Sequence, residues 1–554
     1  MDINKLVDNS IKLNNFETID KIIIKLISFR NFDLAQQVLS KILFFLPNNA
    51  KYLNYFSNLY KAKGEYEISK NYILKALNFN PDNLVYLGNY ADLLFLLKEY
   101  ENAEKIYLDL INKNKENKKA YIGLLNIYVI NYNYKKISSL FKKCKKIFYN
   151  DSLIWQSFLI NIFSNSHQEY IKNIKEFNRI CNNSIDKNIS SKKNKKIKIG
   201  FVTADLRAHP VGYQMYELLG YLCSSKKYEI YIFYNNSVED TVTKYYKSLE
   251  NNWVNIFNLE DSKVLNLINK NNINVLFDLS GLTDSNRLNI FNYRVCDVQA
   301  SWCGWLTSSG ASKIDYIVGD EYATPMSDEH KYFEKIYQLN IWNTLTKEID
   351  LKDVEIINSR KFSNDIILGV FTNPQKVNKI LLNAWCNILK STDKNVKIFF
   401  KYDQFSNNTI KKRFLSVFSK HNIQIDRVIF EGNSKRKEFL EKYNNIDLAL
   451  DTFPYNGGTT SFEASAMNVP ILTKTNDDLF FRCGESINSH LEKKFLIAKS
   501  LDDYIKKTIE LANDKNKLNQ IRLELSDISP KSDLFNYKKH YEKFEEMIES
   551  MLHK

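Results

Sequence analysis

The stretch LDTFPYNGGTTSFEASAMNVPILT, residues 450–473, combines a tight turn with the start of a helix. An apolar run ends at Asp451, and two glycines and two threonines then precede a helix-like segment: Gly457, Gly458, Thr459 and Thr460. Adjacent glycines let the backbone approach a ligand closely, and the free N–H groups at the start of a helix favour phosphate. An ordinary capped helix after a turn is the alternative, so neighbouring motifs must decide between the two.

Two further loops carry side chains suited to group transfer. The loop TADLRAHP (203–210) holds Asp205 and His209, and the loop FTNPQK (371–376) ends at Lys376. His209 titrates in a range that suits a proton acceptor, and Asp205 is an alternative. A lysine together with a helix N-terminus can stabilise a departing diphosphate without a metal. These loops predict a site for an anionic donor, provided that they meet in one cleft.

Histidines and cysteines show no spacing typical of metal ligands. The seven histidines are scattered without an HExxH motif, and no Asp-x-Asp follows an apolar run, so we expect no metal site. The seven cysteines lie far apart without a CxxC motif, which predicts free thiols in a reducing compartment. The N-terminal segment MDINKLVDNSIKLNN does not resemble a signal peptide, and no long uncharged apolar run predicts a membrane span. We therefore expect a cytoplasmic protein.

The formal net charge of +14 comes mainly from lysines scattered among asparagines and isoleucines. Basic runs such as SSKKNKKIK (190–198) are short, which favours solvated linker charge over nucleic-acid binding. A positive chain also suits an anionic donor or an acidic protein partner.

The first third of the chain repeats itself. The aromatic residues Phe32, Tyr66, Tyr100 and Tyr134 recur every 34 residues within similar segments. A period of 34 with two amphipathic helices per unit is typical of tetratricopeptide repeats (TPR). One helix pair cannot bury its own apolar face, so such units stack into a superhelix whose concave surface holds a peptide or partner.

Short apolar runs alternate with helical segments in the rest of the chain. Four runs in one series end in polar, glycine or aspartate residues: 197–206, 228–236, 274–281 and 315–321. A second series has five: 366–373, 396–403, 427–432, 446–455 and 470–475. This alternation predicts two Rossmann-like domains with parallel sheets, and ligands of such sheets lie beyond the carboxyl ends of the strands.

The predicted fold class is therefore α plus α/β: a TPR superhelix followed by a catalytic region of two Rossmann-like domains. At 554 residues the chain is long enough for several domains. We place the boundaries as follows: a helical repeat domain over 1–182, a linker over 183–196, an acceptor-side half over 197–350 and a nucleotide-sugar-binding half over 363–554.

Four segments of the chain resemble the protein O-GlcNAc transferases and their bacterial relatives, of the family 41 type. They are IGFVTADLRAHPVGY (199–213), QASWCGWLTSSGASKIDYIVGDEYATP (299–325), FTNPQKVN (371–378) and LDTFPYNGGTT (450–460). Tandem 34-residue repeats before two Rossmann-like halves are also the arrangement of that family. The resemblance covers essentially the whole chain.

The resemblance implies a GT-B fold, a nucleotide-sugar donor and transfer to protein side chains with inversion. Carried over by position, Lys376 would bind the donor diphosphate, and Thr459 and Thr460 would contact it from the helix start. Glu463 would bind the ribose hydroxyls, and His209 would lie beside the reacting sugar and acceptor. The further residues that the resemblance assigns to donor binding are Asn373, Phe439, Asn456, Gly457, Gly458 and Gly304.

Three positions depart from the family's pattern. Phe439 stands where a histidine packs on the base, Gly458 where the animal enzymes have a donor-contacting histidine, and Glu463 where the family has aspartate. A phenylalanine can stack on a base but cannot form a hydrogen bond with it. These changes leave the base and the sugar open.

The resulting hypothesis is a metal-independent protein glycosyltransferase without a bound cofactor. Its donor would be UDP-GlcNAc, and its acceptor would be Ser or Thr of a protein held in the TPR groove, such as flagellin or another surface protein. Transfer of a hexose to Asn and of fucose from GDP-fucose are alternatives within the enzyme class. A repeat scaffold with a dead catalytic region is the alternative outside it. The oligomeric state stays open.

Overall fold

The computed structural model describes residues 3–131, 133–163, 167–182, 195–345, 353–358, 364–475 and 482–553. The chain divides into two compact units, residues 1–158 and 159–554, and the division falls inside one helix. The sequence places the end of the repeat domain at residue 182, later than this division. Most of the predicted linker 183–196 lies outside the described residues, as does half of the segment 351–362 between the two predicted halves.

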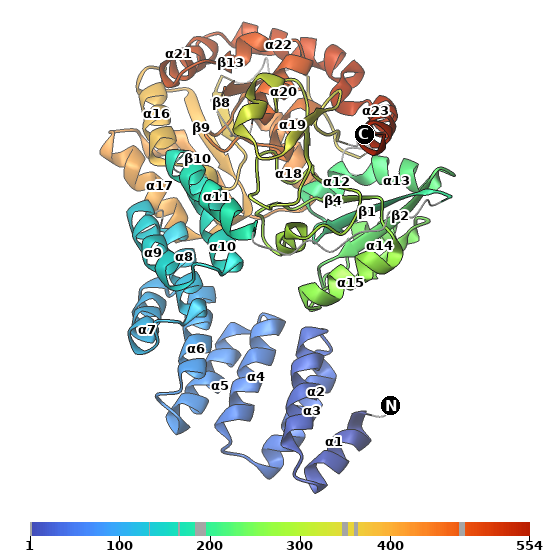
Figure 1. Cartoon of the computed structure of the whole chain (residues 1–554). Helices are drawn as coiled ribbons and strands as arrows, with labels where there is room; N and C mark the ends of the chain where they lie inside the picture. The colour runs from blue at the N-terminus through green and yellow to red at the C-terminus, as the bar shows by residue number, and fades with distance from the viewer. Residues whose placement is uncertain are drawn as a thin grey trace. The chain divides into compact units, whose positions relative to one another are not determined.

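Unit 1 consists of helices that begin at regular intervals (Figure 1). After α1 (Ile3–Lys12) and α2 (Phe16–Ser28), two interleaved series run along the chain. The first series is α3 (Phe32–Phe45), α5 (Tyr66–Phe79), α7 (Tyr100–Lys113) and α9 (Tyr134–Ile147). The second is α4 (Ala50–Lys63), α6 (Leu84–Leu96), α8 (Lys118–Ile130) and α10 (Ser152–Phe163). Each series repeats every 34 residues, so the predicted TPR-like array is confirmed.

The helix caps and the buried small residues of the array also recur every 34 residues. Side-chain oxygens accept hydrogen bonds from the first N–H groups of the second series at Asn49, Asn83, Asn117 and Asp151. A polar cap of this kind fixes where a helix begins. Ala35, Ser69 and Ala103 are fully buried at equivalent positions of the first series, and their small side chains let neighbouring helices approach closely.

Two glycines inside helices of unit 1 predict opposite responses to the same substitution. We expect Gly88→Ala in α6 to raise stability by about 1 kcal/mol, because alanine favours the helix and its Cβ would find its nearest atoms at 3.9 Å. We expect Gly123→Ala in α8 to lower it by about 1–3 kcal/mol, because its Cβ would lie 2.3 Å from the buried ring of Tyr107. Thermal unfolding followed by circular dichroism checks both variants, and shifts of the same sign would contradict this packing.

Unit 2 contains two parallel sheets, as predicted. The first has the order β3-β2-β1-β4-β5-β6-β7. Its strands are β1 (Ile197–Thr203), β2 (Tyr228–Tyr234), β3 (Asn252–Asn255), β4 (Val275–Asp278), β5 (Val298–Ser301), β6 (Tyr316–Gly319) and β7 (Lys335–Gln338). The helices of this half are α12 (Pro210–Gln214), α13 (Tyr216–Ser224), α14 (Thr241–Ser248) and α15 (Asp261–Asn271). The sequence predicts β1, β2, β4 and β6, whereas β3, β5 and β7 were not predicted.

The second sheet has the order β10-β9-β8-β11-β12-β13. Its strands are β8 (Ile366–Val370), β9 (Val396–Lys401), β10 (Val428–Glu431), β11 (Leu448–Leu450), β12 (Ile471–Lys474) and β13 (Ile497–Ala498). All but β13 were predicted. The helices of this half are α16 (Lys379–Lys390), α17 (Asn408–Lys420), α18 (Arg436–Glu441), α19 (Thr459–Ala466), α20 (Cys483–His490), α21 (Leu501–Ala512) and α22 (Lys515–Ile528).

Two helices join the first half from outside its predicted range. The last helix, α23 (Tyr537–Leu552), inserts Phe544 into the first-half core, where its ring centroid lies 5.6 Å from that of Phe277. Figure 1 shows α23 beside α13 of the first half. Helix α11 (His167–Cys181) belongs to unit 2, and the Tyr170 hydroxyl donates to the Ser308 carbonyl at 2.8 Å. The predicted nucleotide-sugar-binding half, 363–554, and the predicted repeat domain, 1–182, therefore each end in a helix that packs on the first half of unit 2.

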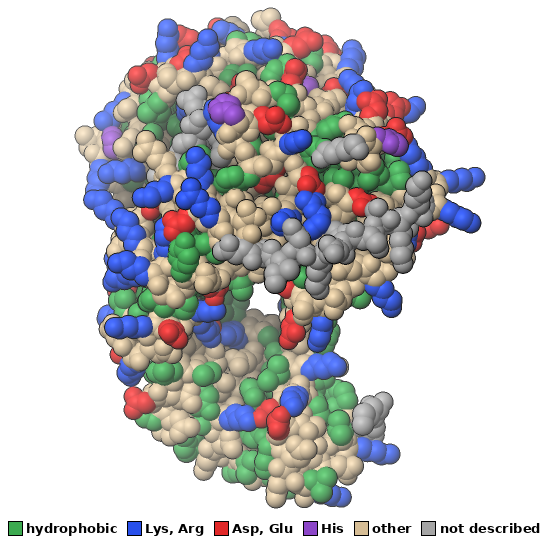
Figure 2. All heavy atoms as spheres, viewed as in Figure 1, with side chains coloured by type: hydrophobic (Ala, Val, Ile, Leu, Met, Phe, Trp, Pro, Cys, Tyr) green, Lys and Arg blue, Asp and Glu red, His purple; other side chains and the backbone are tan. Residues whose placement is uncertain are grey.

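Lysine and arginine side chains are spread over the face of the molecule shown in Figure 2, with acidic side chains among them. No described helix is long and apolar enough to span a membrane.

Candidate active site

The two halves of unit 2 enclose a cavity of about 200 Å³. Its lining includes eight of the residues proposed from sequence: Asp205, His209 and Gly304 from the first half, and Asn373, Lys376, Gly458, Thr459 and Thr460 from the second. These residues lie in loops and helix starts that follow strands, where parallel sheets place their ligands. The motifs that were separate in sequence thus converge on one site.

A buried carboxylate shapes the turn before α19. Asp451 accepts hydrogen bonds from the Gly457 N–H at 2.7 Å and from the Thr473 hydroxyl at 2.7 Å. Burial raises the pKa of Asp451 to about 6, although these donors oppose the shift. A Cβ on Gly457 would lie 2.7 Å from the Ser461 hydroxyl oxygen, so the tight turn requires glycine there. Gly457 and Asn456 do not line the cavity but build the turn that does.

Lys376 lies beside the start of α19. Its Nζ donates to the Asn456 carbonyl at 3.0 Å and stands 3.9 Å from the centroid of the Tyr455 ring. Burial lowers the pKa of Lys376 to about 8. The first N–H groups of α19, at Thr459 and Thr460, have no partner within the helix, and the helix dipole adds positive potential. A cation and a helix N-terminus therefore share one wall of the cavity.

On the opposite half, His209 caps α12. Its Nδ1 accepts from the Val211 N–H at 3.3 Å, which places the proton of the neutral ring on Nε2. Burial and the neighbouring Arg207 lower the pKa of His209 to about 3. Burial raises the pKa of Asp205, which is only 5 % exposed, to about 6. The neutral His209 ring can therefore donate a hydrogen bond from Nε2, and the ionised Asp205 carboxylate can accept a proton.

Glu463 and Phe439 are not among the residues that line the cavity. Glu463 is buried and ion-paired with Arg436 at 2.6 Å, and its other oxygen accepts from the Tyr443 hydroxyl at 3.3 Å. The Phe439 ring packs against that of Phe371, with 5.8 Å between centroids. The Arg436 guanidinium also lies 4.9 Å from the centroid of the Tyr213 ring, so it bridges the two halves. Arg436 was not predicted as a site residue, although it stands three residues before Phe439.

Several cavity-lining residues had not been proposed. They are Pro210, Val211, Gln214, Thr283, Cys303, Leu306, Trp342, Thr372, Tyr402, Tyr455 and Cys483. Tyr455 and Cys303 stand inside the family-like segments 450–460 and 299–325, and Gln214 directly follows the segment 199–213. Trp342 and Cys483 carry no such signal.

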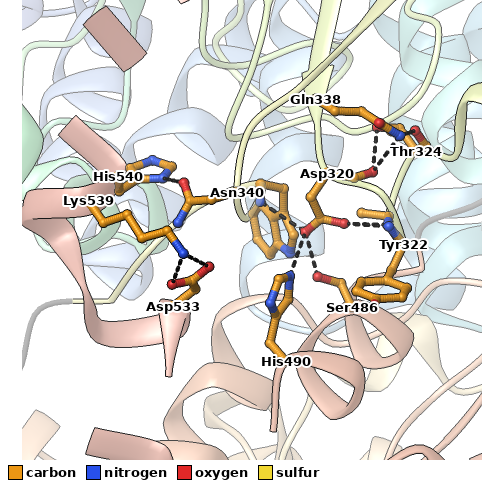
Figure 3. A network of polar contacts seen from close by, with 12 residues as sticks. Asp320, Tyr322, Thr324, Gln338, Asn340, Ser486, His490, Asp533, Lys539 and His540 are labelled. Carbon is orange, nitrogen blue, oxygen red and sulfur yellow. Dashed lines mark hydrogen bonds and ion pairs between the residues drawn. The ribbon is translucent and has the colours of Figure 1, made fainter. Parts of the chain in front are cut away.

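Asp320, at the end of β6, ties the two halves together (Figure 3). Its Oδ2 accepts from the Ser486 hydroxyl on α20 at 2.6 Å and from the Trp342 N–H at 3.0 Å. Its Oδ1 accepts from the Tyr322 N–H at 2.9 Å, and His490 of α20 lies 3.9 Å from Oδ2. Because Trp342 and α20 both contribute to the cavity lining, this carboxylate helps to set the cavity's width.

Among the described residues, no group of three or more His, Cys, Asp and Glu side chains is placed to hold a metal ion.

Two parallel-sheet halves around a cavity, preceded by helical repeats, define the class of GT-B glycosyltransferase folds with an attached TPR array. The structure is similar to that of a mutant O-GlcNAc transferase from Thermobaculum terrenum, with a TM-score of 0.73 over 98 % of both chains and 19 % sequence identity. The model of glycosyl transferase family 41 matches residues 168–345 and 350–544. The chain belongs to this family, as its resemblance to the O-GlcNAc transferases indicated.

Plant proteins named probable UDP-N-acetylglucosamine–peptide N-acetylglucosaminyltransferase SPINDLY are also similar to the chain. The protein from Eustoma exaltatum subsp. russellianum is 28 % identical over 307 residues, which cover 54 % of this chain and 33 % of the relative. The protein from Solanum lycopersicum is 26 % identical over 360 residues, which cover 64 % of this chain and 38 % of the relative. The chain thus matches between a third and two fifths of these relatives' length.

We expect Asp320→Asn to destabilise unit 2 by about 1–3 kcal/mol. Both carboxylate oxygens accept from backbone N–H groups, so either orientation of the amide would set an NH₂ group against a donor. Asp533→Asn, which alters the Asp533–Lys539 pair near the surface, should cost about 0–1 kcal/mol. Chemical unfolding of the two variants compares them, and equal effects would contradict the role of Asp320.

Proposed function

We propose that the protein is an inverting, metal-independent glycosyltransferase that moves GlcNAc from UDP-GlcNAc to Ser or Thr of a protein. The observation that carries this proposal is the division of the cavity. Lys376 and the start of α19 form a positive wall, and Asp205 and His209 lie on the other half. This arrangement supports departure of a diphosphate at one end and activation of a hydroxyl at the other.

In the proposed reaction, the diphosphate leaves toward Lys376 and the N–H groups of Thr459 and Thr460. The acceptor hydroxyl attacks the anomeric carbon from the opposite face and gives its proton to Asp205, directly or through a water. The Nε2–H of His209 orients the reacting oxygens. A fixed lysine and helix start supply the electrostatic help that a metal gives in other transferases.

The test is intact-mass spectrometry of acceptor proteins incubated with the enzyme, EDTA and one nucleotide sugar at a time. UDP-GlcNAc, UDP-glucose and GDP-fucose form the panel, and flagellin, an acceptor suggested by the family resemblance, is tried first. We expect the mass of one or more GlcNAc residues on Ser or Thr. Addition of hexose to Asn, or of fucose, would replace the proposed donor or acceptor, and no transfer from any donor would favour a scaffold.

We expect Lys376→Ala to lower the transfer rate by about 10²–10³-fold while the thermal unfolding midpoint stays near that of the wild type. Among the described residues that line the cavity, Lys376 is the one lysine or arginine, and it contacts the turn before α19. Steady-state assays measure the change, with the exposed Lys379→Ala as the control. A Lys376→Ala enzyme within twofold of the wild-type rate would remove this role.

We expect a bell-shaped dependence of kcat/KM on pH. Activity should rise as Asp205 loses its proton near pH 6 and fall as Lys376 loses its proton near pH 8, because kcat/KM follows the free enzyme. Lys376→Arg should move the fall to higher pH, since arginine stays protonated. Asp205→Asn should abolish the rise, and a rise that survives in this variant would assign it to another group.

We further propose that the TPR-like array guides the protein acceptor, since stacked repeats offer a concave surface for an extended chain. A chain of residues 117–554 tests this. It keeps α8 and α9, and Phe141 of α9 packs 5.3 Å from Trp155 between ring centroids, so the core around α10 stays covered. We expect unchanged hydrolysis of UDP-GlcNAc but at least tenfold slower transfer to a full-length protein acceptor. Transfer at the wild-type rate would leave the repeats without a guiding role.

We also propose that the protein works in a reducing, cytoplasmic compartment. Its seven cysteines are buried thiols, and burial raises the pKa of Cys386, for example, to about 11.

A further inference from the structure

The cavity contains two buried N–H donors that have no hydrogen-bond partner among the described residues. They are Nε2 of Gln214, the last residue of α12, and Nε1 of Trp342. Both residues line the cavity, and they are only 4 % and 2 % exposed, respectively. A buried donor without an acceptor is unfavourable and rare in native structures, which indicates that a ligand supplies the acceptor.

A chain of hydrogen bonds fixes which end of the Gln214 amide is left over. The Thr344 N–H donates to Oδ1 of Asn343 at 2.8 Å, so the Nδ2 of Asn343 points the other way. That Nδ2 lies 2.8 Å from the sulfur of Cys303 and 3.5 Å from Oε1 of Gln214. A flipped Gln214 amide would set its NH₂ against the NH₂ of Asn343. The network therefore holds Oε1 and leaves Nε2 for a ligand.

Trp342 is held as firmly through its backbone. Its N–H donates to Asp320 at 3.0 Å, and its carbonyl accepts from Nε1 of Trp302 at 2.8 Å. The indole packs against Phe462 of α19, and a Cβ placed on Gly458 would lie 3.8 Å from its outer edge. The free indole N–H therefore belongs to a rigid wall next to the start of α19.

We propose that Gln214 and Trp342 determine sugar specificity by donating hydrogen bonds to oxygen atoms of the transferred sugar. The inference rests on the proposed function, which places the diphosphate against Lys376, Thr459 and Thr460 on the second half. Gln214 approaches the cavity from the first half, so it meets the part of the donor beyond the diphosphate.

The chemistry of the two groups restricts the sugar. Together they offer three N–H bonds, two from the amide and one from the indole, and the other amide atom is already occupied. The sugar must present oxygen lone pairs, from a hydroxyl or an acetamido carbonyl, at this wall. A sugar with an ammonium group there leaves donors facing donors, and sites built on buried hydrogen bonds reject such analogues strongly.

Calorimetric titration of the full chain with UDP, UDP-GlcNAc, GDP and GDP-fucose tests the proposal. The measured quantity is the Kd of the nucleotide sugar divided by the Kd of its nucleotide diphosphate. Gln214→Met conserves the size of the side chain and removes the N–H groups, and Trp342→Phe keeps an aromatic ring and removes one. We expect the ratio to rise at least tenfold in each variant while the Kd of the diphosphate stays within twofold of wild type. The exposed Gln520→Leu is the control and should leave both values unchanged.

An unchanged ratio in either folded variant, or an equal loss of nucleotide and nucleotide sugar, would overturn the proposal. The first result would mean that the N–H groups do not touch the sugar, and the second that they only support the fold. If Gln214→Met does not fold, Trp342→Phe decides by the same ratio. Wild-type protein that binds none of the four compounds would refute the proposed function as well, whereas normal binding with an unchanged ratio refutes only the specificity role.

UDP-glucosamine in its ammonium form should show a ratio at least tenfold above that of UDP-GlcNAc in the wild type.

Discussion

The site depends above all on the buried carboxylate of Asp451. It gathers the Thr452 N–H, the Gly457 N–H and the Thr473 hydroxyl around one group, and so bends the chain from the end of β11 into the start of α19. The same bend turns the Asn456 carbonyl toward Lys376, which places a cation beside the free N–H groups of the helix. Without Asp451, the Lys376 ammonium group and the N–H groups at the start of α19 would not face the same point, so they could not bind one anion together.

The second half alone does not complete the cavity. Asp320 of the first half accepts a hydrogen bond from Ser486 on α20 of the second half. The same carboxylate accepts from the backbone N–H of Trp342 and so fixes its position. Arg436 makes a second bridge, from the buried Glu463 to the face of Tyr213. Both bridges use a charged group that is largely desolvated, so each holds only when its partners keep their geometry. The width of the cavity is therefore set by polar contacts and not by apolar packing alone.

Sequence patterns revealed the parts of the fold that repeat or that end long apolar runs. The 34-residue period predicted the helical array, and most strands were found because they are buried on both faces. Strand β3 was not predicted because its four residues NWVN are half exposed at the sheet edge. Strand β13 was not predicted because it has only two residues. The apolar face of α23 covers the core of the first half, and a local sequence pattern does not tell which distant surface such a face will cover. The pairing of Glu463 with Arg436 and the place of Trp342 likewise depend on residues distant in sequence, so local motifs could not supply them.

Burial shifts the pKa values of Asp205 and Lys376 in opposite directions. It raises the pKa of Asp205 to about 6 and lowers that of Lys376 to about 8, because each loses hydration of its charged form. Near neutral pH the carboxylate is still mostly ionised and the lysine mostly protonated, but both lie close to neutralisation. A diphosphate arriving beside Lys376 favours its protonated form, so donor binding raises the pKa of the lysine and strengthens the positive wall. The proposed donor thus keeps the lysine charged for the step in which its own diphosphate leaves.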